Sequence, residues 1–196
     1  MDSLTSLFKY YGTDKEINGY TPYYQRHFEP MRKMPLRVAE IGIGTLIPNV
    51  SSSMVGYGEK HYRTGASLMA WRDYFENPAS EIHGFDIQPD TQIETEARIK
   101  THLVDSTKKR AVDDYHESNP GEWDIVIDDG CHYDSAQLDT VKNFWPYLKR
   151  GGYYIVEDIY PSSRLVTDFL SQFNSAVEDS PWVLSAKRNL LFVYKL

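Results

Sequence analysis

An apolar run that ends abruptly in acids constrains this chain more than any other stretch. Residues 124–132 contain isoleucines and a valine followed by Asp128, Asp129, a glycine, a cysteine and His132, and a second run at 153–158 also ends in acids. Buried strands of a parallel sheet are continuous apolar runs. In open α/β sheets, ligands bind just beyond the carboxyl ends of such strands. The two runs therefore predict neighbouring strands that deliver carboxylates to a divalent-metal or acid/base site.

Length and composition indicate a single globular domain. At 196 residues the chain can bury a core of useful size, and we expect one domain over residues 1–196. Its 41% hydrophobic and 25% charged residues are typical of soluble globular proteins. No apolar run reaches the ~18–20 residues of a membrane span, so no membrane partner is expected.

The charge and the cysteine count argue against further classes. The net charge of −7 disfavours a nucleic-acid partner, because such proteins usually present a basic face. The single cysteine excludes an internal disulfide and is consistent with a reducing compartment. The first residues lack the basic start and apolar stretch of a signal peptide. A cytoplasmic location is therefore expected.

Strand-like and helix-like segments alternate along the chain, and this alternation predicts the fold class. Strands are expected at 36–44, 81–87, 101–105, 124–128 and from 153, helices at 65–75, 108–117, 135–149 and after Pro161, and a hairpin at 182–187 and 190–194. Residues 150–152, with two glycines, are expected to cap the helix at 135–149. The pattern predicts an α/β fold with a doubly wound, mainly parallel, seven-stranded Rossmann-like sheet and a C-terminal antiparallel hairpin.

Two segments outside this alternation are expected to border the site. Residues 1–35 are expected to be a helical segment that covers the site, with Thr21 as an N-cap, Pro22 at the first helical position and a helix end near residue 31. Residues 45–64 are irregular and rich in serine, glycine and proline. Loops of this length in compact domains are usually functional lids or disordered, so a lid-like loop is expected.

The first expected strand runs into a glycine turn. Gly42 and Gly44 follow Glu40, and glycines there let the backbone approach a ligand because no Cβ intervenes. Glu40 lies on an apolar strand, where a lone buried acid needs a partner. Ile47 stands where a dinucleotide fingerprint would have its third glycine, which disfavours a dinucleotide oxidoreductase.

Acids also end the next two expected strands, at Asp86 and Asp105. In dinucleotide-binding folds an acid after the second strand accepts hydrogen bonds from ribose hydroxyls. The alternative for Asp86 is a solvated aspartate at the start of a loop. Together with Glu40, these acids are expected to line the half of a crevice that holds a nucleoside.

The later acids predict a metal. Asp129, Glu157 and Asp158 would repel one another strongly without a cation, and hard divalent ions such as Mg²⁺ favour carboxylate oxygens. His132 follows three residues after Asp129 and, with a reference pKa near ~6.5, could accept a proton from a coordinated hydroxyl. The alternative for His132 is a loop histidine satisfied by the backbone. Asp128 is interpreted as the strand end that supports the turn.

The ordered set of motifs resembles the class I S-adenosylmethionine-dependent methyltransferases. More narrowly, it is similar to the metal-dependent macrolide sugar O-methyltransferases of the macrocin and mycinamicin type. The matching pieces are residues 11–15, 19–22, 40–44, 65–71, 83–87, 127–132 and 151–158. The Asp-Asp-Gly-x-His piece and the Glu-Asp pair are far more specific than the glycine turn.

The resemblance implies roles for the matching residues. S-adenosylmethionine would be held by Glu40, Gly42, Gly44, Ser67, Asp86, Asp105, Ser106 and Asp128. Asp86 would bind the ribose, and Asp105 with Ser106 the adenine. Mg²⁺ would be coordinated by Asp129, Glu157 and Asp158. His132 would be the general base, with Asp129 beside it in catalysis.

The expected function is that of an S-adenosylmethionine- and Mg²⁺-dependent O-methyltransferase acting on a hydroxyl of a sugar or related secondary metabolite, in antibiotic biosynthesis. Two alternatives stay open: the same cofactor with a nitrogen or phenol acceptor, and a non-catalytic cofactor-binding protein that retains the fold. The expected partner is a small, glycosylated molecule, and a homo-oligomer is one candidate assembly.

Overall fold

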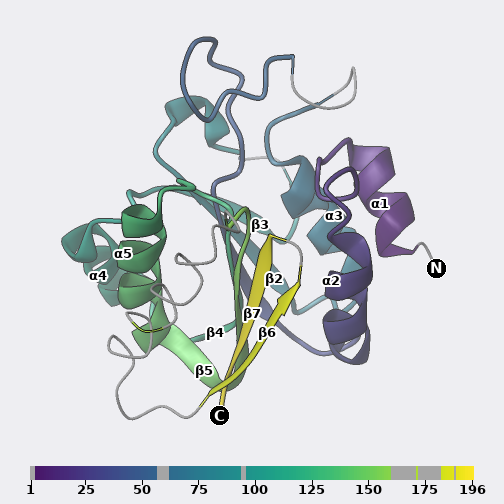
Figure 1. Ribbon diagram of the computed structural model, residues 1–196, viewed down its shortest axis with the longest axis vertical. Coiled ribbons are helices and arrows are strands. Elements are labelled where there is room, and N and C mark those ends of the chain that lie inside the picture. Colours follow the sequence, from purple (N-terminus) through teal and green to yellow (C-terminus); the bar gives the residue numbers. More distant parts are fainter. Residues whose placement is uncertain (1–2, 57–61, 94–95, 160–170, 172–181, 188) are drawn as a thin grey trace. The chain divides into compact units, whose positions relative to one another are not determined.

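The computed structural model describes residues 3–56, 62–93, 96–159, 171 and 189–196, and the backbone of 182–187 (Figure 1). The chain divides into two compact units, Met1–Arg37 with Gly42–Leu103 and Val38–Ile41 with Val104–Leu196. The single domain expected over the whole chain stays a prediction. The helix expected after Pro161 lies outside the described residues.

Aromatic packing organises the first unit. Its elements are α1 (Leu4–Tyr11), α2 (Thr21–Phe28), the 3₁₀ turn η1 (Glu29–Met31), α3 (Ala66–Tyr74), β2 (Glu81–Asp86), the 3₁₀ turn η2 (Pro89–Thr91) and β3 (Ile99–Leu103). The fully buried Trp71 of α3 meets Phe8 of α1 with 5.0 Å between ring centroids and Tyr24 of α2 with 5.1 Å. Such edge-to-face pairs add to the free energy of burying the rings. The N-terminal segment is therefore helical, and its role as a cover over the site stays a prediction.

The start of α2 corrects one detail of the sequence analysis. Gly19 is left-handed (φ 73°), so the chain turns early and Tyr20 is the residue that precedes the helix. Thr21 is already helical, and its buried hydroxyl makes no hydrogen bond. The prediction of Thr21 as the N-cap was wrong, whereas Pro22 does lie in the first turn.

The second unit is built on parallel pairing around one apolar strand. Its elements are β1 (Arg37–Ile41), α4 (Lys109–Ser118), β4 (Trp123–Asp128), α5 (Asp134–Phe144), the 3₁₀ turn η3 (Trp145–Tyr147), β5 (Leu148–Val156), β6 (Trp182–Lys187) and β7 (Leu190–Lys195). β4 pairs in parallel with β1 and with β5. Its central residues, Ile125, Val126 and Ile127, are completely buried, as expected for a strand covered on both faces.

The strand order confirms the predicted fold class. The hydrogen-bonded order is β3-β2-β1-β4-β5-β7-β6. The chain therefore begins in the middle of the order, steps outward to β3 and returns through β4, which is the doubly wound pattern. β7 runs antiparallel to β5 and to β6, so the expected C-terminal hairpin closes a mainly parallel sheet. No helix within the described ranges is long and apolar enough to cross a membrane.

The glycines at 151 and 152 do not cap a helix, as the sequence analysis had predicted. α5 ends at Phe144, and both glycines lie inside β5. The register with β4 shifts there, because Trp123 faces Leu148 while Ile125 faces Tyr153. A Cβ on Gly152 would lie 2.9 Å from the Lys149 carbonyl oxygen, and Gly151 has a φ of 81°. The glycines therefore accommodate a bulge, which needs room for the backbone.

β3 also differs from its predicted bounds, since it ends at Leu103 and leaves Asp105 in the loop that follows. It carries His102, whose Nε2 lies 3.0 Å from Nδ1 of His83 on β2. The two rings stack with 5.2 Å between their centroids. Burial is the first cause that lowers the pKa of each to about 4, and the charge of His102 lowers that of His83 further. Both imidazoles are therefore neutral near pH 7.

This pair predicts a loss of stability in acid. The unfolded chain takes up protons near the reference pKa of ~6.5, whereas the folded pair resists protonation until about pH 4. The free energy of unfolding is therefore unaffected by the pair above pH 6.5 and falls as the pH drops from 6.5 towards 4. In urea unfolding at pH 7.5 and 5.0, the doubly substituted His83→Gln/His102→Gln protein should lose roughly 2–4 kcal/mol less than the wild type between the two pH values, because each histidine contributes up to about 2 kcal/mol. Equal losses in both proteins would contradict the assignment.

Candidate active site

The ends of β1, β4 and β5 hold two acids at fixed backbone positions. In register, Ile41 of β1 faces Asp128, and the Asp129 amide donates to the Ile41 carbonyl at 2.9 Å. On the other side of β4, the Glu157 amide donates to the Asp128 carbonyl at 2.9 Å. The backbone hydrogen bonds between the strands thus continue one residue beyond β4 and β5. Asp129 and Asp158 lie where this backbone pairing ends.

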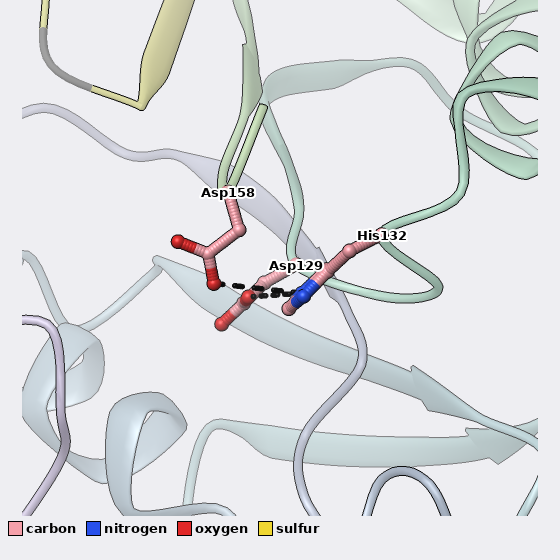
Figure 2. A group of neighbouring side chains, drawn as sticks. All are labelled: Asp129, His132 and Asp158. Carbon is pink, nitrogen blue, oxygen red and sulfur yellow. Dashed lines mark hydrogen bonds and ion pairs between the residues drawn. The ribbon is translucent and has the colours of Figure 1, made fainter. Parts of the chain in front are cut away.

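Three side chains converge beyond these strand ends, as Figure 2 shows. Nε2 of His132 lies 3.3 Å from Oδ1 of Asp129 and 3.6 Å from Oδ2 of Asp158. One ligand atom from each residue lies within 4.8 Å of the others. The two carboxylate oxygens are ligands that hard divalent cations favour, and the imidazole nitrogen beside them could accept a proton. The residues of this cluster therefore fit the predicted metal.

The cluster sets the protonation of its histidine. The hydrogen bond that His132 donates to Asp129 is the first cause that raises the pKa of His132, and the charges of Asp129 and Asp158 raise it further, while burial opposes them. Without a cation, an imidazolium at this position offsets the two carboxylates. A divalent cation held by the same carboxylates would remove that stabilisation and favour the neutral imidazole that a general base requires.

The predicted third ligand, Glu157, is placed differently. Its side chain is buried, and its carboxylate is not a member of the three-residue cluster found in the described part of the chain. Asp158, one residue later, has a left-handed backbone (φ 53°). The sequence analysis therefore brings Asp129, His132 and Asp158 together correctly, and ligation by Glu157 stays a prediction.

Asp128 supports the turn. Its side chain is buried, and Oδ1 accepts a hydrogen bond from the Gly130 amide at 3.3 Å, the pattern of an Asx turn. Burial is the first cause that raises the pKa of Asp128 to about 7, and the charge of Asp129 adds to it. A Cβ on Gly130 would lie 3.1 Å from Cγ2 of Ile41, so the glycine keeps the turn close to β1. The predicted contact of Asp128 with the cofactor remains a prediction.

In the first unit, Asp86 holds the glycine turn. The Gly42 amide donates to the Phe85 carbonyl at 2.8 Å, and Gly42 has a φ of 80°. The Ile43 amide donates to Oδ2 of Asp86 at 3.0 Å, and the Gln88 amide donates to Oδ1 at 2.9 Å. Asp86 is thus a buried turn acceptor and not a solvated aspartate. Its predicted contact with a ribose is not tested by this geometry.

Tyr62 is a contact of the glycine turn that the sequence analysis missed. Its hydroxyl donates to the Ile43 carbonyl at 2.9 Å. A Cβ on Gly44 would lie 2.0 Å from that hydroxyl oxygen and 2.8 Å from Cγ of Met54. The loop after the turn therefore returns to it and fills the space that the glycine leaves. No local pattern could have revealed a contact made across a loop of irregular sequence.

The remaining predicted cofactor residues lie in the two units as follows. In the first unit, Ser67 is buried in the first turn of α3. In the second unit, Glu40 is completely buried on β1 opposite Ile127 of β4. Their positions do not test whether Ser67 and Glu40 contact the cofactor, and these contacts stay predictions.

Asp105 and Ser106 form a tight turn against α5. Oδ1 of Asp105 accepts from the Thr107 amide at 3.0 Å and from its hydroxyl at 2.6 Å. The Ser106 hydroxyl lies 3.0 Å from that of Thr140, and the Ser106 carbonyl accepts from Nδ2 of Asn143 at 2.8 Å. The turn is fixed by these bonds, while an adenine contact stays a prediction.

Residues 62–159, which include β4 and the whole Asp129–His132–Asp158 cluster, match the methyltransferase domain family. The chain belongs to this family. The predicted class of protein is thereby confirmed, and the cluster lies within the matched residues.

Two curated relatives are O-methyltransferases. The chain is 32% identical over 160 residues to mycinamicin VI 2''-O-methyltransferase of Micromonospora griseorubida, covering 80% of this chain and 36% of that protein. It is 35% identical over 144 residues to 8-demethyl-8-(2-methoxy-alpha-L-rhamnosyl)-tetracenomycin-C 3'-O-methyltransferase of Streptomyces olivaceus, covering 72% and 32%.

A solved structure shares the fold along almost the whole chain. MycE methyltransferase from the mycinamycin biosynthetic pathway, in complex with Mg, SAH and mycinamycin VI, superposes with a TM-score of 0.79 at 27% identity, covering 99% of this chain and 54% of that one. The chain thus spans about a third of the curated relatives and about half of the MycE chain.

The glycine turn predicts a large effect of a small substitution. Gly44→Ala places a side chain at a φ of 73° and against the Tyr62 hydroxyl, which should lower the free energy of unfolding by about 2–4 kcal/mol. Tyr62→Phe, which loses the hydrogen bond alone, should cost about 1 kcal/mol. In a double-mutant cycle with Tyr62→Ala, the cost of Gly44→Ala should shrink to its backbone part and the remaining contact with Met54. Strict additivity in chemical denaturation would refute the contact.

The cluster predicts the titration of His132. Asp129→Asn removes the charge and weakens the hydrogen bond that chiefly raise the pKa of His132, so this pKa should fall. Asp139→Asn, on an exposed position of α5, should leave it unchanged. Histidine ring signals followed by NMR against pH in metal-free protein measure both. An equal response to the two substitutions would rule out the proposed coupling.

Proposed function

We propose that this protein transfers the methyl group of S-adenosylmethionine to a hydroxyl of a sugar or glycosylated secondary metabolite, with Mg²⁺ held by Asp129, Glu157 and Asp158 beside His132. The observation that carries the proposal is the convergence of Asp129, His132 and Asp158 beyond β4 and β5 in a chain of the methyltransferase family. The relatives named above are O-methyltransferases by name, one of them of a rhamnosyl compound, and the solved MycE complex contains Mg, SAH and mycinamycin VI.

The residues of the cluster divide the chemistry between them. Asp129 and Asp158 would hold the ion, and the buried Glu157 is proposed as a further ligand. A bound Mg²⁺ would supply Lewis acidity that lowers the pKa of an adjacent hydroxyl. His132 would hold the proton released by the acceptor hydroxyl at Nε2, the nitrogen that faces both acids (Figure 2). The acceptor oxygen would then form its bond to the methyl carbon as the carbon–sulfur bond breaks, and the bonding pair stays on sulfur.

The residues that would bind the cofactor are also part of the proposal. Glu40, Gly42, Gly44, Ser67, Asp86, Asp105, Ser106 and Asp128 would contact S-adenosylmethionine. Asp86 suits a ribose because its carboxylate is fixed by two backbone amides and an ionised carboxylate can accept about four hydrogen bonds. We also propose a cytoplasmic location, a small-molecule acceptor without nucleic acid, and a homo-oligomer as the assembly to test.

The proposal is tested by binding and by turnover. Calorimetry should detect S-adenosylhomocysteine, and methyl transfer to a glycosylated macrolide should require Mg²⁺. Asp129→Asn and His132→Ala should each lower the rate by about 10²–10⁴-fold, the usual contribution of acid–base groups, whereas Asp139→Asn should not. Absence of cofactor binding would overturn the proposal. Full activity on a nitrogen or phenol acceptor in the presence of chelator would replace it with the metal-independent alternative.

A further inference from the structure

A buried amide connects α5 to the strand end that carries Asp158. Nε2 of Gln137 donates to the Glu157 carbonyl at 3.0 Å, and only 2% of the Gln137 side chain is exposed. A buried carbonyl that loses its donor is costly, so this bond holds the β5 end against the helix. The sequence analysis assigned Gln137 no role.

The same helix continues directly from the turn that carries His132. Tyr133 precedes α5, and the Gln137 amide donates to the Tyr133 carbonyl at 3.0 Å. Gln137 therefore stands one helical turn beyond Tyr133, the residue after His132, while its side chain binds the carbonyl of the residue before Asp158. The chain leads from His132 to Gln137, and the Gln137 side chain binds the Glu157 carbonyl. Asp158 follows Glu157, and its Oδ2 lies 3.6 Å from Nε2 of His132.

Asp158 is fixed by its neighbours. The Glu157 amide donates to the Asp128 carbonyl at 2.9 Å, and the Ile159 amide donates to the Asn189 carbonyl at 3.0 Å. Between them, Asp158 takes a left-handed backbone, which non-glycine residues adopt where their surroundings enforce it. The hydrogen bond from Gln137 to the Glu157 carbonyl connects the chain at Asp158 to α5, the helix that follows His132.

We propose that Gln137 is a positioning residue, which sets the separation between Asp158 and the His132 turn and thereby the affinity of the cluster for its metal. This inference rests on the proposed function, because it concerns the Mg²⁺ site. Partners that orient metal ligands without binding the ion typically change its affinity by 10–100-fold.

A matched control lies on the same helix. Asn143 is 7% exposed, and its Nδ2 donates to the Ser106 carbonyl at 2.8 Å. Gln137→Met and Asn143→Leu each keep the approximate side-chain size and remove one buried amide-to-carbonyl bond from α5. They should therefore destabilise the protein comparably, and a merely structural role would give them the same effects.

The experiment titrates Mn²⁺, as a paramagnetic substitute for Mg²⁺, into cofactor-free wild-type protein, Gln137→Met, Asn143→Leu and Asp129→Asn. Ring ¹⁵N signals of His132 are recorded before the metal is added. Gln137→Met should weaken Mn²⁺ binding by about tenfold or more and shift the His132 signals, whereas Asn143→Leu should do neither. If Gln137→Met does not fold, Gln137→Glu against Asn143→Asp makes the same comparison.

The outcomes separate this inference from the proposed function. Wild-type protein that binds no Mn²⁺, or binds it as Asp129→Asn does, overturns the metal site, and the His132 signals then decide the positioning role. A shift in Gln137→Met alone supports that role. Equal effects of Gln137→Met and Asn143→Leu on Mn²⁺ affinity or on the His132 signals overturn it.

Discussion

Like charges held at neighbouring strand ends are the constraint on which the site depends. The ladder between β4 and β5 brings the backbones of Asp129 and Asp158 together, and sheet geometry gives the two carboxylates little freedom to separate. A positive charge between the two carboxylates relieves this repulsion. In this structure the imidazole of His132 faces both carboxylates, which raise its pKa, and in the proposed enzyme a metal cation would lie there. The raised pKa of the histidine and the proposed affinity for metal are thus two responses to one repulsion.

The same repulsion explains why the buried acid next door is separated from the cluster. Asp128 faces the interior, where burial raises its pKa to about 7 and allows it to remain uncharged near neutral pH. A second ionised carboxylate at that depth would oppose Asp129. The doublet of adjacent acids therefore contains one residue, Asp129, that faces His132 and one, Asp128, that forms the turn.

The sequence predicted the parts of the fold and site that depend on periodicity. Asp129 and Asp158 could be placed together because the carboxyl ends of adjacent parallel strands share an edge. The bulge at Gly152 could not be predicted, because the room around this glycine depends partly on the Asp124 carbonyl oxygen of β4, which would lie 3.0 Å from a Cβ there. Tyr62 and Gln137 were missed for a related reason: each makes one hydrogen bond to a backbone carbonyl, and such bonds leave no periodic trace.

The left-handed backbone of Asp158 limits which acid can serve there. A φ of 53° is tolerated by aspartate and asparagine far better than by longer side chains. Exchange of aspartate for glutamate, normally conservative in a metal site, would here combine a longer reach with backbone strain. The position thus couples the choice of ligand to a conformational requirement. A search for distant relatives can use this coupling, since a functional substitute at 158 should be drawn from the short polar residues.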